Sequence, residues 1–157
     1  MARAYVLTVS DRSARGERAD ETGPTLAARL RDLGHAVHVD VVPDDALLIA
    51  DAVSAAASCH DLVVVAGGTG LGPRDVTPQA VGTVLDYEIP GFGELMRAEG
   101  RRSTPLASLS RSLAGVAGST LVLVVPGSPR GALESLDAVA ALLPHALDTL
   151  AGGDHAR

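Results

Sequence analysis

The sequence predicts an α/β protein, a three-layer α/β/α sandwich built around a mostly parallel sheet. Strand-like apolar runs at 4–10, 61–66 and 119–127 alternate with segments whose apolar residues recur at helical spacing. The second and third runs are almost continuously apolar, as expected of parallel strands covered on both faces. Strands that alternate with helices are joined by right-handed crossovers, which place helices on both faces of the sheet.

The first elements follow from local patterns. Residues 4–10, AYVLTVS, predict a buried strand. A helix is expected over 25–35, because Pro24 suits its first position and Gly34 lies near its end. In 36–42 apolar and polar residues alternate, which predicts a more exposed strand.

The middle of the chain continues the alternation. Asp44 is placed to cap a helix that runs to about Ser58, although its carboxylate could equally help to position a metal. Residues 61–66, DLVVVA, predict a buried strand. Thr77 and Pro78 then begin another helix, since a threonine cap followed by proline is a typical helix start.

The last third repeats the pattern. A short helix is expected within 88–102, a second buried strand over 119–127 and a closing helix over 129–150. In the closing helix leucines recur at helical spacing on one face, and Pro144 is expected to bend it. We therefore expect a single domain over 1–157, with its core at about 4–150.

Composition excludes several classes of function. The chain has one cysteine and all 13 of its basic residues are arginines, which excludes an internal disulfide, a Schiff-base lysine and the lysine of a P-loop. A formal net charge of −6 argues against a nucleic-acid partner. The sequence also shows no membrane span and no signal peptide, so a cytoplasmic protein is expected.

Three unusual loops follow the three apolar strands. The first strand ends in Ser10 and Asp11, the second ends in the glycine-rich run Gly67-Gly68-Thr69-Gly70, and the third ends in Gly127-Ser128. In an open α/β sheet, ligands bind beyond the carboxyl ends of the strands, so these loops are expected to converge on one site.

The glycine-rich run matches neither usual nucleotide motif, because Pro73 stands where a Rossmann glycine or a P-loop lysine would be needed. Glycines nevertheless let backbone amides approach phosphate oxygens, and the helix start at Ser128 offers further amides. The alternative for both loops is tight turn geometry alone.

Charged residues favour a phosphate site. Arg74 offers planar donors for phosphate oxygens, and Asp75 could coordinate Mg²⁺ bound to nucleotide phosphates. The alternative is an ion pair within the loop. With Asp44, the loop holds the ingredients of phosphoryl or nucleotidyl transfer, in which positioning and charge neutralisation do most of the catalysis.

The segments TVSDR, GGTGLGPRDVTPQA, EIPGFGELMR and LSRSLAGVAGSTLVLVVPGSP resemble the Mog/MoaB-type molybdopterin-binding domain of molybdenum cofactor biosynthesis. The resemblance runs from about Tyr5 to Leu150. It implies an α/β sandwich that usually assembles as a trimer. The best-known members are molybdopterin adenylyltransferases, in which the terminal phosphate of molybdopterin attacks the α-phosphate of MgATP and pyrophosphate leaves.

The resemblance also implies roles for individual residues. It matches Asp75 to an aspartate required for catalysis through Mg²⁺ and Asp44 to a second functional aspartate. The matching phosphate-binding and pterin-pocket positions are Gly67, Gly68, Thr69, Gly70, Ser10, Asp11, Ser128 and, nearby, Ser110 and Arg111. Molybdopterin and ATP are the implied substrates, and a molybdate-insertion enzyme is the implied recipient of the product.

Two other functions stay open on the sequence. One is a module that binds molybdopterin without adenylylating it, and the other is hydrolysis of a nucleotide-sugar pyrophosphate. The intact Arg74-Asp75-Val76-Thr77 run favours the transferase. The hydrolase is disfavoured, because the sequence supplies no evident base to activate water.

Overall fold

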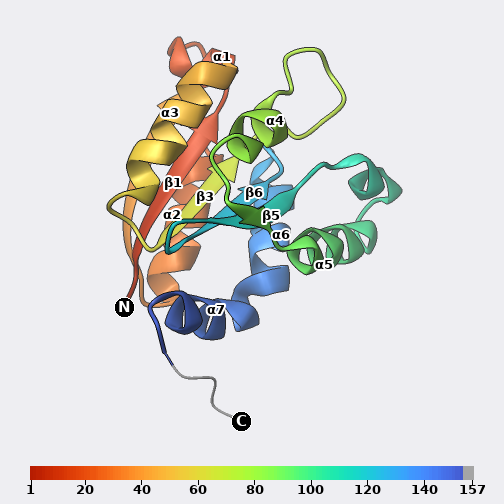
Figure 1. Ribbon diagram of the computed structural model, residues 1–157. Coiled ribbons are helices and arrows are strands. Elements are labelled where there is room, and N and C mark those ends of the chain that lie inside the picture. The colour runs from red at the N-terminus through yellow and green to blue at the C-terminus, as the bar shows by residue number, and fades with distance from the viewer. Residues whose placement is uncertain (154–157) are drawn as a thin grey trace.

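A single six-stranded sheet forms the centre of the protein, with strand order β2-β1-β3-β6-β5-β4 (Figure 1). The computed structural model describes residues 1–153, so the last four residues of the expected domain lie outside the described part. Four strands run parallel to one another: β1 (Arg3–Val9), β2 (Ala36–Val42), β3 (Leu62–Ala66) and β6 (Thr120–Val125). β4 (Tyr87–Glu88) and β5 (Leu113–Ala117) are antiparallel, so the predicted mostly parallel sheet is confirmed.

Helices cover both faces of the sheet, which gives the predicted three layers (Figure 1). One face packs against α2 (Thr22–Asp32), α5 (Pro90–Arg101), α6 (Pro129–Val139) and α7 (Leu143–Leu150). The other packs against α3 (Ala46–Ala57) and α4 (Thr77–Gly82). The remaining short helices are α1 (Asp11–Ala14) and the 3-10 turns η1 (Pro105–Leu109) and η2 (Ala140–Leu142).

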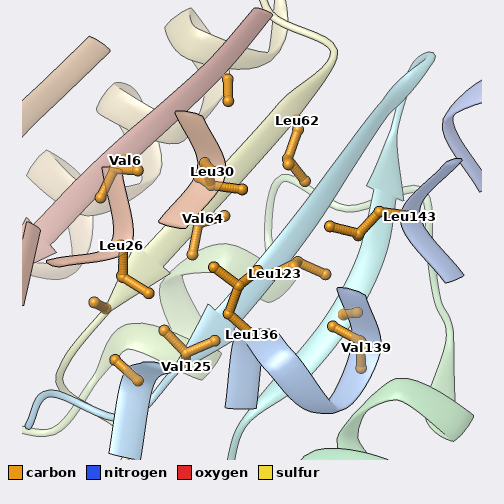
Figure 2. Close-up of a cluster of buried hydrophobic side chains, with 14 of the residues drawn as sticks. Val6, Leu26, Leu30, Leu62, Val64, Leu123, Val125, Leu136, Val139 and Leu143 are labelled. Carbon is orange, nitrogen blue, oxygen red and sulfur yellow. The ribbon is translucent and has the colours of Figure 1, made fainter. Parts of the chain in front are cut away.

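Alternate residues of the central strands enter the two cores, because successive side chains of a strand point to opposite faces. In β3, Val64 packs with Leu26 and Leu136 in the core shown in Figure 2, whereas Val63 and Val65 pack with Ile49 of α3 on the other face. This double burial explains why 61–66 and 119–127 are so continuously apolar.

Three predicted helices differ in their starts. α4 begins at Thr77 itself, with Val76 at the cap position and no side-chain cap, so the expected threonine cap is wrong. α2 begins at Thr22, so Pro24 is its third residue rather than its first. α3 is capped by Asp45, whose carboxylate accepts a hydrogen bond from the Leu48 amide at 3.0 Å. The prediction that Asp44 caps this helix is therefore wrong, and its carboxylate is available for other contacts.

The antiparallel strands β4 and β5 were not predicted. β5 reads Leu-Ala-Gly-Val-Ala, which is a weak strand pattern, and it pairs with β6 through a tight turn at Gly118. The closing helix is broken rather than merely bent, since η2 separates α6 from α7 and Pro144 lies in the first turn of α7. Within residues 1–153, no helix is long and apolar enough to cross a membrane.

Candidate functional site

The three predicted loops meet at one edge of the sheet. Thr8 of β1 pairs with Ala66 of β3, and Ala66 pairs with Val125 of β6, so all three parallel strands end at the same level. The Gly67 amide then donates to the Val125 carbonyl at 3.1 Å, which ties the second loop to the third strand. The convergence expected from the sequence is thus present in the fold.

Two cavities open at this edge. The polar cavity, of about 370 Å³, is lined by seven of the predicted site residues: Ser10, Asp44, Gly67, Gly68, Asp75, Gly127 and Ser128. The apolar cavity, of about 290 Å³, is lined by Thr69, Gly70, Ser110 and Ser128 together with Met96, Leu106 and Leu109. Ser128 belongs to both linings, so the two cavities are neighbours.

Gly67 and Gly68 have backbone conformations that side chains other than glycine rarely adopt, with φ of 108° and 66°. A Cβ at Gly67 would overlap the Val9 carbonyl oxygen, and one at Gly68 would overlap the Thr77 hydroxyl. Both glycines are therefore required by the turn itself. Because the same residues line the polar cavity, the turn also leaves their backbone open to a ligand.

Ser10 and Ser128 each cap a helix. The Ser10 hydroxyl accepts a hydrogen bond from the Ser13 amide at 3.2 Å, and the Ser128 hydroxyl accepts one from the Gly131 amide at 3.1 Å. A hydroxyl that accepts from an amide still has its own proton to donate. Both can therefore donate into the polar cavity.

Asp11 and Asp44 hold each other's backbone. The Asp11 amide donates to the Asp44 carboxylate, and the Asp44 amide donates to the Asp11 carboxylate, each at 3.0 Å. Arg74 completes the cluster: its guanidinium binds both carboxylate oxygens of Asp11 at 2.8 and 2.9 Å and the Asp44 carbonyl at 3.1 Å. Arg74 is thus placed against Asp11, and neither of these two residues lines the cavities described for residues 1–153.

The cluster sets opposite pKa shifts on its two acids. The bound Arg74 guanidinium, with the Asp44 amide, lowers the pKa of Asp11. Burial raises the pKa of Asp44, and the negative charges of Asp11 and Asp75 raise it further. Asp44 is therefore the acid in this cluster that gains most from a nearby cation.

Asp75 lies at the end of the glycine-rich loop. Its carboxylate accepts a hydrogen bond from the Gly72 amide at 2.9 Å, and its own amide donates to the Gly72 carbonyl at 3.0 Å. The hydroxyl of Thr77 is fully buried and has no hydrogen-bond partner within the described chain. It lies beside Gly68, as does one oxygen of the Asp44 carboxylate, so an unpaired donor and a carboxylate flank the same turn.

Arg111, which the resemblance placed near the pocket, contacts the glycine-rich loop from the segment between η1 and β5. Its guanidinium binds the carbonyls of Gly70 and Asp75, and its amide donates to the Thr69 carbonyl at 3.0 Å. Arg97 was not predicted as a site residue, yet it lines the apolar cavity and binds the Ser112 carbonyl at 2.7 Å. Its only signal in the sequence was its place within EIPGFGELMR.

Comparison with known proteins identifies the family. The model described as "Probable molybdopterin binding domain" (MoCF_biosynth) matches residues 5–145, most of the chain. The chain belongs to this molybdopterin-binding family. It is similar to the crystal structure of the molybdopterin biosynthesis enzyme MoaB from Thermus thermophilus, with a TM-score of 0.91 and 48% identity over 97% of this chain and 98% of that one.

Curated relatives of the family differ in length. The chain is 36% identical to a molybdopterin adenylyltransferase of Helicobacter pylori over 152 residues, covering 94% of this chain and 86% of that protein. It is 40% identical to a molybdenum cofactor biosynthesis bifunctional protein of Synechococcus elongatus, over 97% of this chain. There it spans about half (48%) of the relative's length.

Proposed function

We propose that this chain is a molybdopterin adenylyltransferase, which transfers AMP from MgATP to the terminal phosphate of molybdopterin and releases pyrophosphate. The observation that carries the proposal is the pair of adjoining cavities at the sheet edge, one polar with Asp44 and Asp75 in its lining and the other mainly apolar. Its family relatives of similar length include proteins named molybdopterin adenylyltransferase.

The two cavities suit the two parts of the reaction. In the polar cavity, backbone around Gly67 and Gly68 and the hydroxyls of Ser10 and Ser128 are assigned to phosphate oxygens. The apolar cavity, with Met96 in its lining and Ser110 among its polar groups, is assigned to the flat pterin. Because Ser128 lines both cavities, a phosphate at their junction would lie between pterin and nucleotide.

The donor set fits Mg²⁺ bound together with substrate. Asp44 and Asp75 both line the polar cavity, and no group of three potential ligands is found within residues 1–153. Mg²⁺ is usually held by one or two carboxylates and completes its shell with phosphates and water. We assign Asp44 and Asp75 as its protein ligands, where the ion would neutralise phosphate charge as the transfer proceeds.

The chain's own residues then position the reactants. A terminal phosphate oxygen of molybdopterin forms a bond to the α-phosphorus of ATP, the bond from that phosphorus to the bridging oxygen breaks, and pyrophosphate leaves. Asp11 holds the Asp44 backbone, and Arg74 holds Asp11, so this cluster fixes one of the two carboxylates. Such transfers depend mostly on positioning and electrostatic stabilisation.

The test is a label-transfer assay. Purified protein is mixed with molybdopterin, Mg²⁺ and ATP labelled at the α-phosphate, and the pterin is recovered. Label on the pterin supports the transferase. Pterin binding without label transfer would instead make the chain a binding module and would contradict the proposal.

The acid limb of the pH–rate profile is expected to follow the Asp44 pKa, since Asp44 must be ionised to hold a cation. The Arg74 charge lowers the Asp44 pKa and the Asp11 charge raises it. Arg74→Gln should therefore move the acid limb of kcat/KM to higher pH, and Asp11→Asn should move it to lower pH. If the acid limbs of the two variants moved in the same direction, Asp44 would not be the group that sets this limb.

We also propose a cytoplasmic homotrimer that hands adenylylated molybdopterin to a molybdate-insertion enzyme. Leu47 and Leu71 support an interface between copies, since these apolar side chains are 76% and 70% exposed. Sedimentation equilibrium is expected to give the mass of three chains. A single-chain mass at micromolar concentration would contradict the trimer.

A further inference from the structure

Arg111 draws together the two ends of an otherwise exposed segment. Its Nη2 atom donates to the Gly70 carbonyl at 2.8 Å and to the Asp75 carbonyl at 2.6 Å. Its Nε atom donates to Gly70 as well, at 3.1 Å, and its Nη1 atom donates to the Gln79 side chain at 3.0 Å. One guanidinium therefore closes the segment 70–75 and joins it to α4.

The segment has little else to hold it. Its middle residues, from Leu71 to Arg74, are all exposed to solvent, and Leu71 is 70% exposed. Within the described chain, the Arg74 contacts with the Asp11 cluster fix one side, and Arg111 fixes the other. An exposed loop with few packed contacts opens readily unless hydrogen bonds close it.

Arg111 does not belong to the linings of the polar or the apolar cavity described for residues 1–153. The Nε, Nη1 and Nη2 atoms of its guanidinium all donate to protein oxygens. Together with its backbone amide, Arg111 makes five such hydrogen bonds, and four of them go to backbone carbonyls. Arg111 does line a separate cavity of about 300 Å³ beside Pro78 and Arg97, but its guanidinium nitrogens are bonded to protein oxygens, so it holds the loop.

We propose that Arg111 is a positioning residue for the AMP transfer, acting through Asp75. This inference rests on the proposed function. The Asp75 carbonyl is held by Arg111, while the Asp75 carboxylate is held by the Gly72 amide inside the segment that Arg111 closes. The guanidinium thus fixes both the backbone of Asp75, which lines the polar cavity, and the local turn that holds its carboxylate.

The planar fork of arginine is essential to this arrangement. Arginine presents several donors in fixed directions, so it can bind Gly70, Asp75 and Gln79 together. Lysine carries the same charge on a single nitrogen and cannot reproduce the fork. A role in positioning therefore predicts that Arg111→Lys fails, whereas a role of charge alone predicts that it succeeds.

The kinetic test compares Arg111→Ala and Arg111→Lys with wild type in the label-transfer assay. Both variants are expected to lower kcat about 100-fold, since small displacements of a catalytic group cost that much. The KM for molybdopterin should change by less than about threefold, because Arg111 does not contact the pterin. A wild-type kcat in Arg111→Lys, or a loss confined to KM, would overturn the proposal.

The matched control is Arg102→Ala, which removes an exposed arginine paired with Glu99 on the C-terminal end of α5. It should leave kcat unchanged. Thermal unfolding of all three variants separates positioning from folding: Arg111→Lys should melt close to wild type although it is slow.

Hydrogen exchange tests the clamp without any assay of activity. In Arg111→Ala, the peptide covering 67–79 should exchange at least about tenfold faster, while the β3 and β6 peptides stay at wild-type rates. Unchanged exchange in 67–79 would overturn the inference whatever the enzyme does. If wild type transfers no label but the exchange effect appears, the proposed function fails and the clamp remains.

Discussion

Replacing Asp75 with asparagine is expected to lower kcat for AMP transfer by about 100- to 1,000-fold, the usual cost of removing one preorganised electrostatic group. Asparagine keeps the oxygen that accepts the Gly72 amide, so the local turn should survive. It removes the negative charge that we assign to Mg²⁺. The loss should therefore appear in the label-transfer assay while thermal unfolding stays near wild type.

Asp51→Asn is the control, because Asp51 is an exposed residue of α3. It removes the same charge and should leave transfer unchanged. A nearly wild-type kcat in Asp75→Asn would remove the metal role from Asp75, although the family assignment would stand. Titration of Mn²⁺ into the nucleotide complex should show weaker binding in Asp75→Asn than in Asp51→Asn.

Gly67→Ala is expected to damage both folding and activity. Gly67 has a φ of 108°, and an added Cβ would overlap the Val9 carbonyl oxygen, which is backbone of the neighbouring strand. Strain in φ and overpacking against a strand together cost about 3 kcal/mol or more in the free energy of unfolding. Transfer should also fall, because the turn that opens the loop to phosphate would be displaced.

Gly82→Ala provides the matched comparison. Gly82 ends α4, and an added Cβ there would meet nothing within 4 Å. The same substitution should be neutral or stabilise the protein by up to about 1 kcal/mol, since alanine favours helix. Equal denaturation midpoints for Gly67→Ala and wild type would show that the turn tolerates a side chain.

Much of the fold follows from hydrophobic patterning. β3 and β6 were predictable because burial on both faces leaves almost no polar residue in them. β5 was not, because its glycine and alanines carry little strand preference and its pairing with β6 is a tertiary contact. The choice between Asp44 and Asp45 as helix cap also depends on backbone geometry, which two adjacent aspartates do not reveal.

The site was predictable at the level of which loops meet. The strand ends of β1, β3 and β6 bring Ser10, Gly67 and Ser128 to one cavity, as parallel topology requires. The partners of the arginines were not predictable, because they depend on contacts far apart in sequence: Arg74 binds Asp11, and Arg111 binds the loop from the segment between η1 and β5. The sequence shows which side chains are charged, but the groups that those side chains contact are set by the tertiary structure.

The measurement that tests the central claim most directly is the stoichiometry of the wild-type reaction. Protein, molybdopterin, Mg²⁺ and ATP are incubated, and adenylylated pterin and pyrophosphate are both quantified. The transferase predicts equal amounts of the two products, and neither when molybdopterin is omitted. Bound molybdopterin with no adenylylated product would contradict the account and leave the glycine-rich loop as a binding site alone.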